Sequence, residues 1–169
     1  MNYRSEIVNK IIPYFEIDSK YHLLVGDMGF AVTDEIKAKM PERMTNCGIM
    51  EQGMVGIAAG MALSGMIPIV YSIVNFLCFR ALEQIRNDVV LQGLNVKFIA
   101  TGVNDYFEFL GPSHCCGQDD IAIMKLIGID VWNPYAIDSI KPSSEFASWT
   151  FDNVIDDWLD SDRAGYMRV

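Results

Sequence analysis

The chain has 169 residues, of which 51% are hydrophobic, a size and composition that suit one globular domain with its own apolar core. Its 13 Lys and Arg against 22 Asp and Glu give a net charge of -9, which argues against binding to nucleic acid or to an anionic membrane surface. The 4 cysteines form no C-x-x-C pair, and no secretory signal opens the sequence. We therefore expect a cytoplasmic protein with reduced thiols.

Apolar periodicity and turn residues predict helices and strands that alternate along the chain. Helices are predicted at residues 5–15, 33–40, 51–63, 79–92, 119–126 and 144–159. Strands are predicted at residues 21–26, 44–47, 67–72, 96–101, 129–132 and 165–169. This alternation indicates a single domain over residues 1–169, a three-layer α/β/α sandwich with a mainly parallel central sheet.

An uncharged stretch between Glu51 and Arg80 is long enough to cross a bilayer. However, the turn-forming pair Ser64-Gly65 divides it, and residues 67–72 form a β-branched run typical of a strand. The pattern favours a buried helix followed by a buried strand, so no association with a membrane is predicted.

Glu51 is the strongest candidate for a catalytic residue, because it is the first residue of the predicted helix at 51–63 and lies just after a strand. A carboxylate at a helix N-terminus is stabilised by free amides and the helix dipole, so a cap-like structural role is one interpretation. Desolvation by Met54, Val55 and Ile57 favours another, in which the carboxyl group shares a proton with a ligand nitrogen. The residue pattern alone leaves both open.

Several segments carry a resemblance to a known family. Residues 48–65 read GIMEQGMVGIAAGMALSG and resemble the Gly-Ile-x-Glu-Gln segment of transketolases and deoxyxylulose-phosphate synthases. The similarity continues, in the family's order, through PIVYS at 68–72, RALEQIRND at 80–88, GPSH at 111–114, DIA at 120–122 and GYMRV at 165–169. The chain thus resembles the pyrimidine-binding domain of transketolase-like thiamine diphosphate enzymes, which implies their cofactor-binding fold of the pyrimidine-domain type.

The resemblance implies that Glu51 hydrogen-bonds N1′ of the cofactor's aminopyrimidine and so activates thiamine diphosphate. Phe76 is the expected stacking partner of the pyrimidine ring. Strict spacing counted back from Gln84, however, places Leu77 at the stacking position. Phe79, Ile49 and Arg80 are further expected cofactor contacts.

His114, in the Gly-Pro-Ser-His loop, is the expected second catalytic residue. It matches a histidine that lines the family's substrate channel, with Cys115 as a competing match. Transketolases carry His-Asp where Gly102-Val103 stand here, and Asp in place of Leu110. Because those polar groups contact hydroxyls of the ketose donor, a less hydroxylated donor such as a 2-oxo acid becomes an alternative.

The segment Gly26-Asp27-Met28-Gly29 lacks the Gly-Asp-Gly…Asn motif by which the family's other half binds Mg²⁺ and diphosphate. We therefore expect no metal ligand in this chain, and Asp27 is expected to be a turn or substrate-rim residue. The family's third, C-terminal domain is also expected to be missing. A diphosphate-binding partner subunit, assembling into a heterotetramer, is expected to supply the Mg²⁺ ligands.

Together these features predict a transferase: a subunit of a split transketolase-like enzyme that moves a two-carbon unit between small carbonyl compounds and is active only with its partner. One alternative is a beta-type chain of a thiamine diphosphate-dependent 2-oxo acid decarboxylase or dehydrogenase. A non-catalytic scaffold domain and a flavodoxin-like small-molecule binding module are others.

Overall fold

A computed structural model describes residues 3–139 and 150–169. In this part of the chain a six-stranded sheet has the order β2-β1-β3-β4-β6-β5, with every neighbouring pair parallel. The strands are β1 (Tyr21–Val25), β2 (Met44–Asn46), β3 (Ile67–Ile73), β4 (Lys97–Thr101), β5 (Asp130–Trp132) and β6 (Gly165–Arg168). The predicted parallel α/β architecture is confirmed, and all the carboxyl ends of the strands meet at one edge.

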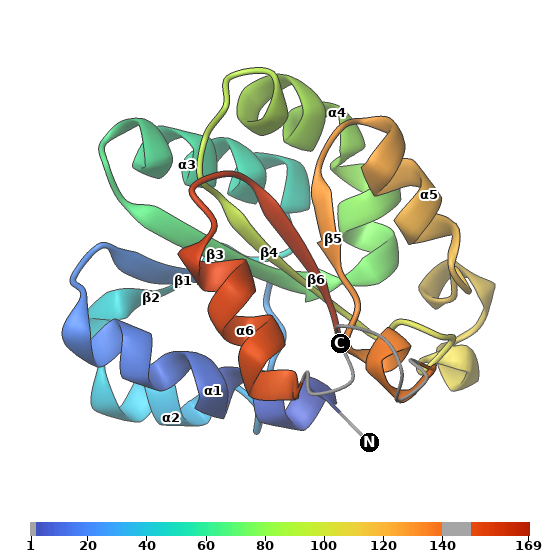
Figure 1. The fold of residues 1–169 in the computed structure, drawn as a ribbon, viewed down its shortest axis with the longest axis horizontal. Coiled ribbons are helices and arrows are strands. Elements are labelled where there is room, and N and C mark those ends of the chain that lie inside the picture. The colour runs from blue at the N-terminus through green and yellow to red at the C-terminus, as the bar shows by residue number, and fades with distance from the viewer. Residues whose placement is uncertain (1–2, 140–149) are drawn as a thin grey trace.

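Helices cover both faces of this sheet and form the outer layers (Figure 1). They are α1 (Tyr3–Ile17), α2 (Asp34–Lys39), α3 (Glu51–Leu63), α4 (Leu82–Gln84), α5 (Asp119–Leu126) and α6 (Phe151–Asp160). On one face lie α3, α4 and α5; on the other lie α1, α2 and α6 (Figure 1).

The central strands β3 and β4 are buried on both faces, so their successive side chains enter different cores. In β3, Val70 packs in the cluster under α3, whereas its neighbours Ile69 and Tyr71 pack in the cluster under α1. In β4, Phe98 and Ile99 divide in the same way. This double burial explains why the strand sequences are continuous apolar runs without polar alternation.

The predicted helix at 79–92 begins earlier than its pattern indicated. A π-helical turn at Phe76–Arg80 precedes α4, and a second at Ile85–Val90 follows it. The Ala81 N–H bonds to the Phe76 carbonyl, the i→i+5 spacing of a π-helix. Phe76 therefore lies on a helical segment at the carboxyl edge of the sheet and not in the preceding loop.

The helix predicted at 144–159 is α6 in its described part, since residues 144–149 lie outside the described residues. Thr150 caps α6: its hydroxyl accepts the Asn153 N–H, while the Asn153 side chain accepts the Thr150 N–H. Because this cap has an extended backbone, α6 starts at Phe151.

No helix in the described part of the chain is long and apolar enough to cross a membrane. The uncharged stretch is divided as predicted, with α3 ending at Leu63 and β3 beginning at Ile67.

Lys97, at the start of β4, is a fully buried cation remote from the carboxyl edge. Its ammonium group donates to the backbone carbonyls of Ser161 at 2.7 Å and Arg163 at 2.9 Å, which ties the turn before β6 to the sheet. Burial lowers the pKa of Lys97 to about 8. We assign this amine a structural task because its donors serve the backbone.

Candidate active site

The candidate site lies where the loops after β1 and β2 meet the start of α3. Asn46 joins these loops: its side-chain oxygen accepts the N–H groups of Asp27 at 3.0 Å and Gly48 at 2.9 Å. Its amide nitrogen donates in return to the Asp27 carboxylate at 3.1 Å. Asp27 has a positive φ of 52°, so the structure gives this residue a turn role. Sequence reasoning missed Asn46, although an Asn at the carboxyl end of a strand is a signal for such a role.

Glu51 is the first residue of α3 and is only 2% exposed. Its carboxylate lies against the end of β1, since a Cβ built on Gly26 would be 3.7 Å from Glu51 Oε1. Met54 and Val55 are fully buried beside it, whereas Ile57 is exposed. The expected desolvation therefore comes from the backbone and the first turn of α3.

Arg80 is the charged partner of this buried carboxylate. Its Nη1 donates to Glu51 Oε2 at 2.7 Å, while 43% of the arginine side chain remains exposed. The guanidinium carbon also lies 4.2 Å from the centroid of the Phe76 ring, a cation–π distance. Arg80 thus lies between a carboxylate and an aromatic face.

His114 completes the cluster from the loop after β4. Its ring meets the Phe76 ring edge-on at a centroid distance of 5.2 Å, and Ser113 Oγ lies 3.0 Å from its Nδ1. By contrast, the Cys115 thiol points to the Gly111 carbonyl. His114 is therefore the residue of this pair that reaches the Phe76 ring.

The structure brings most of the expected site residues together. Glu51, Phe76, Arg80 and His114 are in contact, and Phe79 lines with Phe76 and Arg80 a shallow depression that also includes Asn75 and Ser113. Leu77 is fully buried in the core under α3, so its side chain is unavailable for stacking at the surface. Ile49 is 76% exposed and lies outside the depression.

The loop from residue 102 to 117 carries His114 and is packed through an aromatic ring. Gly102 has a φ of 81°, and a Cβ built there would lie 2.2 Å from the Phe107 ring. Only glycine fits, because both the backbone conformation and the ring exclude a side chain. The Phe107 ring thus takes the space in which a side chain at position 102 would lie.

Two contacts fasten this loop to the helical segment that carries Phe76. Asn75 Nδ2 donates to the Cys115 carbonyl at 3.0 Å. The thiols of Cys78 and Cys116 are both buried, and their interaction together with burial raises the pKa of Cys78. These contacts therefore fix the position of His114 relative to the Phe76 ring.

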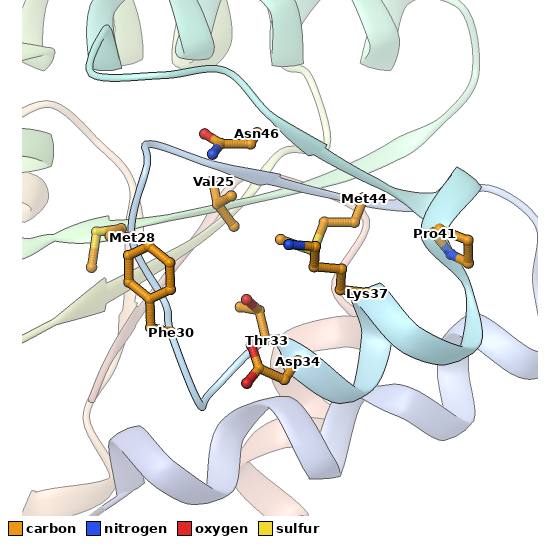
Figure 2. A pocket seen from close by; sticks show the side chains of 9 residues that line it. All are labelled: Val25, Met28, Phe30, Thr33, Asp34, Lys37, Pro41, Met44 and Asn46. Carbon is orange, nitrogen blue, oxygen red and sulfur yellow. The ribbon is translucent and has the colours of Figure 1, made fainter.

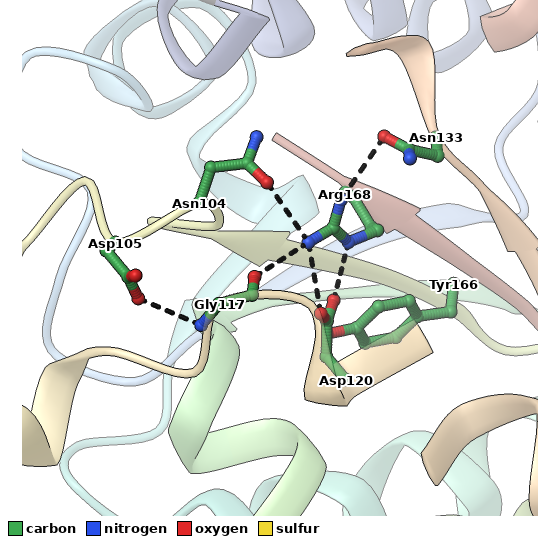
Figure 3. A network of polar contacts seen from close by, with 7 residues as sticks. All are labelled: Asn104, Asp105, Gly117, Asp120, Asn133, Tyr166 and Arg168. Atoms are coloured by element: carbon green, nitrogen blue, oxygen red, sulfur yellow. Dashed lines mark hydrogen bonds and ion pairs between the residues drawn. The ribbon is translucent and has the colours of Figure 1, made fainter. Parts of the chain in front are cut away.

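A buried ion pair anchors both ends of the same loop to the last strand (Figure 3). Arg168 on β6 donates from Nε to Asp120 Oδ2 at 2.7 Å and from Nη2 to Asp120 Oδ1 at 3.0 Å, and both side chains are fully buried. Arg168 also donates to the carbonyl of Gly117 and to the side chains of Asn104 and Asn133.

Tyr166 donates to the same Asp120 carboxylate, and burial followed by the nearby charge raises its pKa well above the ordinary value. The carboxylate therefore has both a cation and a neutral donor. Sequence reasoning missed this network, because its members are separated by up to 64 residues.

A separate cavity of about 220 Å³ lies on the α2 side of the sheet (Figure 2). Val25, Met28 and Met44 form its apolar part, and they pack on the face opposite α3. Lys37 and Asn46 contribute polar groups. Asn46 therefore lines this cavity and also holds the loop that leads to Glu51. The cavity and the candidate site are neighbours, but Glu51 does not line the cavity.

Fold and cluster together define a class of protein: an α/β domain whose carboxylate and aromatic ring, at the carboxyl edge of a parallel sheet, suit a flat nitrogen heterocycle. Residues 18–148 match the family described as "Transketolase, pyrimidine binding domain". The chain belongs to this family.

Two curated relatives are named as a subunit and as a section of a transketolase. The 6-deoxy-6-sulfo-D-fructose transketolase subunit SqwH of Clostridium sp. (strain MSTE9) is 30% identical over 145 residues, which cover 85% of this chain and 44% of the relative. A putative transketolase C-terminal section of Methanocaldococcus jannaschii is 41% identical over 117 residues, covering 66% of this chain and 36% of the relative. The chain thus spans less than half the length of either relative.

Two solved structures are similar over nearly the whole chain. One, described as a split gene transketolase, inactive beta4 tetramer, has a TM-score of 0.79 at 25% identity and covers 99% of this chain and 51% of its own. The transketolase of Campylobacter jejuni has a TM-score of 0.72 at 16% identity, covering 97% of this chain and 25% of its own, and shows the shared fold alone.

The Arg168–Asp120 pair provides a test of how the loop is anchored. Replacing Arg168 with Met leaves a buried carboxylate without its cation, so we expect a loss of about 3–5 kcal/mol in the free energy of unfolding, measured by urea denaturation. The double variant Arg168→Met/Asp120→Leu should recover part of this loss, because no buried charge is then unpaired.

Arg163→Met is the matched control. It removes an arginine from an exposed pair with Asp130, and less than about 1 kcal/mol is expected. Equal losses for Arg168→Met and Arg163→Met would contradict the anchoring role.

Proposed function

We propose that this chain is the pyrimidine-binding subunit of a split thiamine diphosphate-dependent transketolase-like enzyme, which transfers a two-carbon unit between small carbonyl compounds. The observation that carries the proposal is the buried Glu51 carboxylate, held beside the Phe76 ring in a chain of this family. A scaffold domain has no need to remove a carboxylate from water at this position.

The residues present fit the aminopyrimidine end of the cofactor. Glu51 offers a desolvated carboxylate that can hold a proton at N1′, and Phe76 offers a flat face for the ring. The side-chain oxygen of Asn75 is buried and has no hydrogen-bond partner within the described residues. Because Asn75 lines the depression, this oxygen is an acceptor available to a ligand N–H.

When bound, thiamine diphosphate supplies the nucleophilic carbon that attacks the substrate carbonyl. Glu51 controls the proton on the pyrimidine nitrogen, and Phe76 with Phe79 orients the ring and excludes water. His114, which meets Phe76 edge-on, is placed to move protons at the substrate beside that ring.

The diphosphate and Mg²⁺ are assigned to a partner subunit. The Asp27 carboxylate is engaged by Asn46, and the described residues hold no group of three or more His, Cys, Asp or Glu side chains that suits a metal ion. Exposed apolar side chains gather at or next to the carboxyl edge, where a partner would cover them; they are Ile49, Met50, Phe79, Phe109 and Leu110.

The names of relatives support this division, since they denote transketolase subunits or sections. We propose a heterotetramer in which each site combines this chain with a diphosphate-binding chain. The free cysteines fit a reducing compartment such as the cytoplasm.

The partner requirement is tested with the purified chain. Alone, it is expected to bind thiamine diphosphate weakly even with Mg²⁺ and to show no turnover, as measured by calorimetry and by ketose formation. Adding the diphosphate-binding chain should restore both. Tight Mg²⁺-dependent binding by this chain alone would contradict the split site, and carbon dioxide release from a 2-oxo acid would indicate a decarboxylase.

Glu51→Gln tests the proton-holding role in the reconstituted complex. The amide keeps the shape of the side chain but cannot share a proton, so we expect kcat to fall at least about 100-fold while the subunits still assemble. Glu83→Gln, which changes an exposed glutamate in α4, is the control and should leave kcat unchanged. A near-normal rate for Glu51→Gln would rule out the proposed activation.

His114→Ala is expected to lower kcat by about tenfold or more, because a proton-transfer group is lost, while the Kd of the cofactor stays within about twofold of the wild-type value. Steady-state kinetics and calorimetry separate the two quantities. Cys115→Ala serves as the comparison, since its backbone contact to Asn75 is retained. If Cys115→Ala slows turnover and His114→Ala does not, the assignment of the channel residue is wrong.

A further inference from the structure

Arg80 contacts two side chains of the candidate site at once. Its guanidinium group contacts the Glu51 carboxylate at 2.7 Å and lies 4.2 Å from the centroid of the Phe76 ring. These are the two groups that the proposed function assigns to the aminopyrimidine, one as proton partner and one as stacking face. Both groups are therefore already in contact with a side chain of the protein.

A guanidinium group and an aminopyrimidine ring offer matching chemistry. Both are planar and both have a flat face that stacks on an aromatic ring. The guanidinium presents N–H donors at the edge of its plane, and the ring nitrogen does so when the proton held by Glu51 is on it. A carboxylate and a phenyl ring arranged for one of them suit the other. Since Arg80 already uses the Glu51 carboxylate and the face of Phe76, a ring that binds to the same two groups must compete with it.

We propose that Arg80 is an internal stand-in for the aminopyrimidine ring, which keeps Glu51 and Phe76 in their ligand-binding arrangement until the cofactor displaces it. This inference rests on the proposed function of Glu51 and Phe76. It names a task that differs from the direct cofactor contact expected of Arg80 from the sequence.

The burial of Glu51 explains why a stand-in is needed. Glu51 is almost fully removed from water, and a buried carboxylate without a charged partner destabilises the fold. Arg80 satisfies it through the ion pair. Because 43% of the arginine side chain is exposed, the guanidinium has a route into solvent when the ring arrives.

Displacement lowers the apparent affinity for the ring, because only the fraction of molecules in which Arg80 has left Glu51 can bind it. Removing the guanidinium should thus weaken the fold yet tighten binding. A direct cofactor contact predicts the opposite sign, since its removal weakens binding. A purely structural ion pair predicts lower stability with unchanged affinity.

The experiment measures binding of the hydroxymethyl aminopyrimidine half of thiamine to the full chain by ligand-observed NMR titration. This probe reports on the half of the site that the chain contains and requires no turnover. Compared with the wild type, Arg80→Met is expected to bind it roughly three- to tenfold more tightly. Equal or weaker binding by Arg80→Met overturns the stand-in.

Arg86→Met is the matched control, because it removes an exposed arginine from the adjoining helical segment without touching Glu51. It should bind the probe as the wild type does; a gain equal to that of Arg80→Met would assign the effect to net charge and overturn the stand-in. If Arg80→Met does not fold, Arg80→Lys decides: it keeps the charge but loses the planar face, and tighter binding than wild type is again required.

Glu51→Gln separates this inference from the proposed function. Probe binding that is lost in Glu51→Gln, but is not tightened in Arg80→Met, leaves the function standing and removes the stand-in. Binding that is absent from both wild type and Arg80→Met, or that is insensitive to Glu51→Gln, refutes the pyrimidine site and the stand-in together.

Discussion

A carboxylate that has been taken out of water dominates the architecture of this edge of the sheet. A buried charge is tolerated only with a partner that supplies opposite charge or a proton, so the position of Glu51 imposes a requirement on its surroundings. Arg80 meets that requirement in the chain by itself. In the proposed enzyme a ring nitrogen meets it, and the carboxyl group then becomes a place where a proton can be controlled.

The surrounding structure serves to hold this group in place. Parallel strands bring their carboxyl ends together, and the reciprocal bonds of Asn46 brace the turn at Asp27 and the approach to α3. The segment between the end of β2 and the first turn of α3 is short, so the backbone at Glu51 has little conformational freedom. The position of Glu51 is thus set by regular elements and by the Asn46 amide.

The sequence predicted the fold because its signals are local. Strands buried on both faces are continuous apolar runs, and Glu51 falls on the first residue of α3, as the pattern indicated. The pairing with Arg80 was hidden because it joins residues 29 positions apart through tertiary structure. The sequence left the choice between Phe76 and Leu77 open for a related reason. The direction in which a helical side chain points depends on where the helix begins. The π-helical turn begins three residues before the predicted helix.

The two parts of the proposed site rest on different parts of the sheet, which bears on how such a protein can change its substrate. Glu51 depends on β1, β2 and α3, whereas the loop with His114 depends on Phe107 over Gly102 and on Arg168 of β6. In that loop the Phe107 ring packs against Gly102, whereas the carboxylate is buried at a different set of elements. The loop meets the segment of Phe76 and Arg80 through a backbone carbonyl and buried thiols, so its exposed side chains can vary in polarity without changing the elements that hold Glu51. In the proposed enzyme, substrate preference is therefore free to diverge while cofactor activation stays the same.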